Sequence, residues 1–68
     1  MARWQVELPE VGRIYDGYHA HNAYLQYRQA VWCSLQPGHE WHGRTVLVFR
    51  DERIYREHVG SLDREPSP

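Results

Sequence analysis

Residues 22–35 predict a helix that is apolar on two opposite faces. With each residue turned about 100° from the one before, Leu25 and Trp32 fall on one face, with Gln29 between them. The opposite face carries a second set of small and apolar side chains: Ala23, Tyr27, Ala30, Val31 and Ser34, with Tyr24 and Leu35 at its edge. A helix on the surface of a small domain normally needs only one apolar stripe. The second stripe is therefore expected to contact more of the same chain, a second copy or a partner.

Length and composition restrict the class of protein. The chain has 68 residues, 41% of them hydrophobic and 25% charged. These values are typical of one small globular domain, expected over residues 1–60, followed by a flexible, proline-rich tail over residues 61–68. No stretch is apolar over the ~20 residues that a membrane-spanning helix needs, and the single cysteine, Cys33, excludes an internal disulfide. We therefore expect a cytoplasmic protein without a membrane segment.

Two extended segments precede the predicted helix. Residues 3–8 alternate between apolar and polar side chains, which predicts a half-buried strand. Residues 9–12 predict a turn, and residues 13–20 predict the return strand. Asp16-Gly17 lies inside that segment and forms either a bulge within one strand or the turn of a separate hairpin. We favour the bulge, because two separate strands would be very short.

Local signals also set the limits of the helix and of the strand that follows it. Asn22, preferred over His21, is the expected N-cap residue. Pro37-Gly38 is expected to end the helix. Residues 44–50 then form a continuous β-branched and apolar run, which predicts a central strand covered on both faces.

Residues 51–59 are compatible with two structures. As a helix, they offer Asp51 as a cap, pairs of opposite charge four residues apart, and Gly60 as a stop. As a strand, they pair with the preceding run across a turn at residues 50–53. We favour the strand, because a helix would leave the last strand with no partner adjacent in the chain. The predicted fold is α+β, a small antiparallel β-sheet (ββαββ) packed on one α-helix.

Histidine and cysteine side chains are the candidates for metal binding or catalysis. His19 and His21 are two residues apart, and His39 and His42 are three apart. These spacings miss the Cys-Cys and His-His pairs of structural zinc sites. Cys33 falls near the end of the predicted helix, where the helix dipole disfavours a thiolate nucleophile. We therefore predict no catalytic residues, no metal or other cofactor, and no enzymatic activity.

An arginine-rich and aromatic stretch in the last third of the chain supports nucleic-acid binding as an alternative function. Arginine side chains and aromatic rings together hold single-stranded nucleic acids. All eight basic residues are arginine, a bias typical of a GC-rich genome, but the net charge is only −1. Strand alternation places the side chains of Tyr55 and Arg56 on opposite faces. The residues of this alternative site are Arg44, Arg50, Arg53, Tyr55 and Arg56.

Protein binding is the function that the second apolar stripe of the helix favours most directly. Trp and Arg are enriched among the residues that dominate binding energy, and the second helix stripe carries both. The helix stripe of Leu25 and Trp32 is free to bind unless residues 36–43 or the tail fold over Trp32. We therefore predict a small non-enzymatic binding protein, an interaction module or inhibitor, whose partner is another protein or a second copy. Short chains of this architecture are frequent among phage-encoded inhibitors, an analogy at the level of the fold. The predicted contact residues are Leu25, Arg28, Gln29, Trp32 and Trp41.

Overall fold

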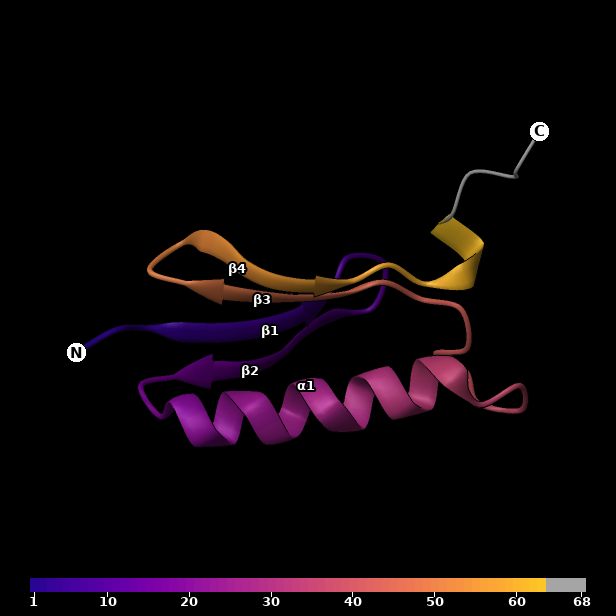
Figure 1. Ribbon diagram of the computed structural model, residues 1–68, viewed down its shortest axis with the longest axis horizontal. Coiled ribbons are helices and arrows are strands. Elements are labelled where there is room, and N and C mark those ends of the chain that lie inside the picture. Colours follow the sequence, from indigo (N-terminus) through magenta and orange to yellow (C-terminus); the bar gives the residue numbers. More distant parts are fainter. Residues whose placement is uncertain (64–68) are drawn as a thin grey trace.

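The computed structural model describes residues 1–63 and places one helix against one face of a four-stranded antiparallel sheet (Figure 1). The elements are β1 (Trp4–Leu8), β2 (Gly12–Gly17), α1 (Ala20–Leu35), β3 (Val46–Arg50), β4 (Arg53–His58) and a short 3-10 helix, η1 (Ser61–Asp63). The strand order across the sheet is β2-β1-β3-β4. The predicted α+β fold with ββαββ order is therefore confirmed.

The first hairpin contains a bulge, but not at Asp16-Gly17, where we expected it. Asp16 pairs regularly with Gln5, and the register shifts at Ile14, which has no partner on β1. The extra residue lets both Ile14 and Tyr15 pack against the core. Asp16 stays in register because its carboxylate accepts hydrogen bonds from the Arg3 guanidinium at 2.9 and 2.6 Å. The bulge therefore forms where it adds an apolar contact with the helix.

The N-terminus of α1 also differs from the prediction. The N-cap residue is His19, with no capping hydrogen bond from its side chain, so the expected cap at Asn22 is wrong. The Tyr15 hydroxyl instead accepts a hydrogen bond from the His19 N–H at 3.3 Å and lies 3.4 Å from the His19 carbonyl oxygen. Gly17 leaves room for this contact, since a Cβ there would lie 2.6 Å from the Tyr15 hydroxyl oxygen. A tertiary contact thus replaces the local cap.

The second hairpin confirms the strand interpretation of residues 51–59. Its turn residues Asp51 and Glu52 have φ of 48° and 68°, as a two-residue type I′ turn requires. Strand β3 is central, as predicted, but it is covered on one face only. Val48 is buried beneath α1, whereas Phe49 on the opposite face is half-buried, and α1, the one α-helix of residues 1–63, lies on the Val48 side (Figure 1).

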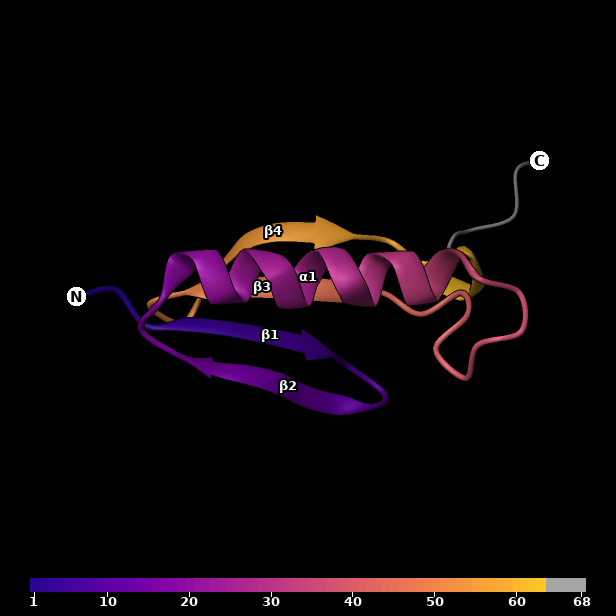
Figure 2. The same ribbon diagram turned by 90° about the horizontal axis from the view of Figure 1, so that it is seen from below.

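The core lies between α1 and the sheet. The buried hydrophobic residues are Val6, Leu8, Ala23, Ala30, Cys33, Val46 and Val48. Two of the helix residues among them are alanines, whose small side chains let the helix axis approach the strands. The helix contacts β1, β2 and β3. In Figure 2 it lies over β3, with β4 on one side and β1 and β2 on the other. This offset leaves the helix-side face of β4 open.

Two glycines close the end of the molecule opposite the β3–β4 turn. The Gly43 N–H donates to the Ser34 carbonyl, and the Gly43 carbonyl accepts from the Leu62 N–H at 3.0 Å. A Cβ on Gly60 would lie 2.0 Å from the Gly43 carbonyl oxygen, so the two backbones touch.

Ser61–Asp63, the first residues of the expected tail, form η1 here, and residues 64–68 lie outside the described part of the chain. Within residues 1–63, no helix has the length and apolar character needed to span a bilayer.

Candidate binding surface

The outer face of α1 carries the predicted ridge, defined here as Leu25, Gln29 and Trp32. Trp32 is 61% exposed and Leu25 is 46% exposed, so neither the loop after the helix nor the described part of the tail buries them. Arg28 and Gln29 are exposed beside them. These four predicted contact residues share one open helix surface.

Trp41, the fifth predicted contact residue, has a different environment. Its ring packs against the hydrophobic core and lies edge-on to the His39 ring, with 5.5 Å between the ring centroids. The backbone N–H of Trp41 also donates a hydrogen bond to His39 Nδ1 at 3.0 Å. The side chain therefore holds the loop in place, and we leave it out of the ridge.

One flank of the helix joins the ridge to the side that faces β4. Leu35 is 61% exposed and Tyr24 is 45% exposed on this flank, and the Arg28 guanidinium carbon lies 5.8 Å from the centre of the Tyr24 ring. A shallow hollow of about 260 Å³ runs along it, lined by Tyr27, Arg28, Val31, Trp32 and Leu35. The two apolar stripes of the helix are therefore one continuous surface on the β4 side.

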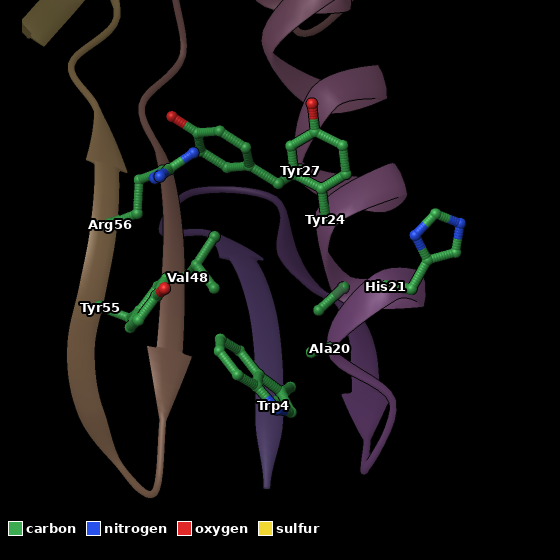
Figure 3. A pocket seen from close by; sticks show the side chains of 9 residues that line it. Trp4, Ala20, His21, Tyr24, Tyr27, Val48, Tyr55 and Arg56 are labelled. Atoms are coloured by element: carbon green, nitrogen blue, oxygen red, sulfur yellow. The ribbon is translucent and has the colours of Figure 1, made fainter. Parts of the chain in front are cut away.

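That surface ends in a pocket between α1 and β4, which we call the α1–β4 groove (Figure 3). Its volume is about 330 Å³. Four of the lining side chains are aromatic, and they come from β1, α1 and β4. The lining residues are Trp4, Ala20, His21, Ala23, Tyr24, Tyr27, Val48, Tyr55 and Arg56.

A bulge in β4 brings both of its groove residues to the same side. Val48 pairs with Arg56, and Phe49 pairs with Ile54, so Tyr55 is the extra residue. Simple alternation separates the side chains of Tyr55 and Arg56, and that prediction is wrong for this reason. In Figure 3 both side chains reach into the groove.

Within the groove, the aromatic rings contact one another and arginine side chains. The Trp4 and Tyr55 rings meet edge-on, with 4.9 Å between their centroids. The guanidinium carbon of Arg56 lies 5.9 Å from the Tyr27 ring centre, and that of Arg50 lies 5.7 Å from the Trp4 ring centre. Such cation–π contacts fix the direction of the guanidinium groups.

No protein-family model, curated protein or solved structure matches this chain. The function must therefore be inferred from the surfaces of the chain itself.

Charge is distributed unevenly between the two sides of the sheet. Helix α1 contains no carboxylate, and none of the groove-lining residues is acidic. On the opposite face, the Arg3–Asp16 pair at 2.6 Å and the Arg13–Glu7 pair at 3.7 Å neutralise one another. The Arg3 guanidinium, which donates a hydrogen bond to Asp16, lowers the pKa of that carboxyl to about 2. Helix α1 and the lining of the groove therefore carry arginine side chains with no carboxylate among them.

The five residues of the alternative nucleic-acid site do not form one cluster. Arg50, Tyr55 and Arg56 lie in or beside the groove. Arg44 forms an ion pair with Glu10 of the first hairpin turn. Arg53 is exposed next to the β3–β4 turn.

The candidate catalytic and metal-binding residues have structural contacts. Cys33 is buried in the core side of the helix, and the Ser34 hydroxyl donates to the Arg44 carbonyl at 2.7 Å. His39 orders the loop through Trp41, as described above. Within residues 1–63, no three or more His, Cys, Asp or Glu side chains come together as a metal site would require.

Proposed function

We propose that this chain is a non-enzymatic binding module that binds another protein through the ridge of α1. The supporting observation is that Trp32 is 61% exposed and Leu25 is 46% exposed on a helix whose opposite face already packs on the sheet. Contiguous exposed apolar surface of this kind is typical of interaction sites. Burying one large apolar side chain contributes roughly 1.5–3 kcal/mol.

The composition of the ridge suits a protein partner. Trp32 provides a large anchor of the type that dominates binding energy, and Arg28 and Gln29 provide a polar rim. A module of this kind acts by covering or recruiting a surface, as inhibitors do. The single cysteine, Cys33, is buried and unpaired, which is compatible with action in the cytoplasm.

Nucleic-acid binding is the second candidate function. It is favoured by the gathering of Arg50, Tyr55 and Arg56 with further aromatic rings at a groove without acidic residues. Three of the four groove rings already have an arginine over their faces, however, which leaves fewer faces for base stacking. We therefore rank the protein partner first. The salt dependence of binding distinguishes the two functions, because affinity that rests on phosphate contacts falls steeply as the salt concentration rises.

The experiment is an affinity capture from the lysate of a GC-rich bacterium, with and without nuclease, using the wild-type chain, Trp32→Ala and Tyr18→Ala. Tyr18 is the matched control, an aromatic residue 57% exposed outside the ridge. Sedimentation velocity of the same three proteins measures self-association.

We expect one stoichiometric protein, or a second copy, to bind the wild type and Tyr18→Ala but not Trp32→Ala. Because Trp32 is mostly exposed, its replacement should change stability by no more than about 0.5 kcal/mol. Binding that Trp32→Ala retains in full would refute the ridge. Loss of all binding on nuclease treatment would favour the second candidate. A large fall in melting temperature for Trp32→Ala would instead show that the side chain supports the fold.

A further inference from the structure

We infer that the α1–β4 groove binds an extended peptide segment of a partner protein, which adds a fifth strand to the sheet at β4 and carries an acidic residue two positions from an apolar one. This inference goes beyond the ridge of α1, because it uses other residues and another type of contact. Either surface can bind without the other.

The first observation is the free edge of β4. Within residues 1–63, β4 pairs with β3 along one edge, and no other strand pairs with it. Its other edge therefore presents backbone N–H and C=O groups that an incoming strand can pair with. The edge strand on the far side of the sheet, β2, is packed against by α1. Among the strands of residues 1–63, only β4 combines a free edge with an open groove on the helix side.

The second observation is the lining of that groove. Side chains of an added strand point alternately to the two faces of the sheet, so every second residue would point to the helix side, where a large side chain reaches the groove by passing over β4. That space holds about 330 Å³, near the lower end of the range for ligand pockets, and is walled by Trp4, Tyr24, Tyr27 and Tyr55. It is suited to apolar side chains from an extended segment and not to a whole helix.

The third observation is charge. Arg56 and His21 line the groove and Arg50 lies over the Trp4 ring, while the lining includes no carboxylate. An Asp or Glu two positions from the apolar residue would lie on the same face of the added strand and meet the guanidinium groups of Arg50 and Arg56. The absence of acidic residues from the lining argues against a second copy, because pairing two β4 edges would join two cationic grooves.

Backbone pairing distinguishes a peptide from a nucleic acid, because a nucleic acid cannot extend the hydrogen-bond ladder of the sheet.

The probe is a displayed library of random linear peptides, selected against the wild-type chain. The enriched sequences are then synthesised and measured by fluorescence anisotropy against the wild type, Arg56→Gln and Arg13→Gln. Arg13 is the matched control, an exposed arginine on the opposite face of the sheet.

We expect the enriched peptides to alternate, with an acidic residue two positions from an apolar or aromatic one. Arg56→Gln should weaken binding about tenfold or more, since a charge-assisted contact is lost, while Arg13→Gln should leave it unchanged. N-methylation of alternate peptide amides, those facing β4, should abolish binding, and N-methylation of the amides between them should not. Amide chemical shifts of β4 should move on binding.

Several results would overturn the inference. They are a library with no enriched peptides, binding that tolerates N-methylation at every position, and equal affinity for Arg56→Gln and the wild type. Displacement of the peptides by a single-stranded oligothymidylate would assign the groove to nucleic acid. A wild-type dimer that the peptides cannot dissociate would assign the β4 edge to a second copy. Peptides lost with Trp32→Ala but not with Arg56→Gln would belong to the ridge, so failure of the groove leaves the proposed function standing.

Discussion

Replacing Glu52 by glycine should stabilise the protein. Asp51 and Glu52 have φ of 48° and 68°, a region that costs a residue with a side chain about 1–2 kcal/mol. Glycine removes that cost but loses about 0.5–1 kcal/mol in chain entropy. The difference is a net gain of about 0.5–1 kcal/mol, which raises the melting temperature by roughly 2–8 °C in a chain of this size. Asp51 is not the residue to change, because its carboxylate accepts a hydrogen bond from the Arg3 N–H at 3.0 Å.

Thermal and urea unfolding of the wild type, Glu52→Gly and Glu52→Ala measure this effect. Glu52→Ala keeps the backbone penalty and should show no gain, so it separates backbone conformation from loss of the side chain. The sign of the stability difference between the glycine and alanine variants distinguishes a turn from a helix. A helix over residues 51–59 would lose about 1 kcal/mol on the same substitution, so a glycine variant less stable than the alanine variant would refute the type I′ turn.

Two further effects follow from the packing and the ion pairs. Gly60→Ala should cost about 3 kcal/mol or more, because its Cβ would lie 2.0 Å from the Gly43 carbonyl oxygen, whereas Gly38→Ala, with no atom within 4 Å, should be nearly neutral. Unfolding midpoints of the two alanine variants check this difference, and equal midpoints would contradict it. The pKa of Asp16 is lowered from 3.8 to about 2 by its hydrogen bond with Arg3, so the stability it contributes is complete above pH 4 and is lost as the pH falls toward 2. Melting temperature against pH should therefore fall less steeply below pH 4 for Asp16→Asn than for the wild type, and parallel curves would rule the ion pair out as the cause.

The sequence predicts those parts of the fold that depend on neighbours along the chain. Alternation in residues 3–8 locates β1, and Pro37-Gly38 marks the end of α1. A bulge in the first hairpin was predicted, but its position at Ile14 and the bulge at Tyr55 were not, because both depend on how the strands pair across the sheet. Ile14 and Tyr55 each become the extra residue where the helix side offers an apolar contact.

The binding surface could be predicted only in part, for a similar reason. Helical periodicity places Leu25 and Trp32 opposite the core, and both are exposed there. The groove depends on the helix lying over three strands and leaving the fourth uncovered, which no local pattern encodes. Trp41 was predicted to contact a partner but packs against the core, because the path of the loop places its ring there. The lack of any carboxylate in a helix of 16 residues was the sequence signal for a groove wall without negative charge.

The arrangement around α1 explains why one helix has two apolar faces. Its flank toward β4 carries Tyr24 and Leu35, which join the ridge to the groove, while its other flank carries polar residues such as Asn22 and Gln26. If the outer stripe served only to add stability, the apolar side chains would be expected to gather on the face toward the sheet. Instead they extend from the sheet across one side of the helix to its outer face. A partner that covers this surface would complete the layer above β4, which a single helix leaves unfinished.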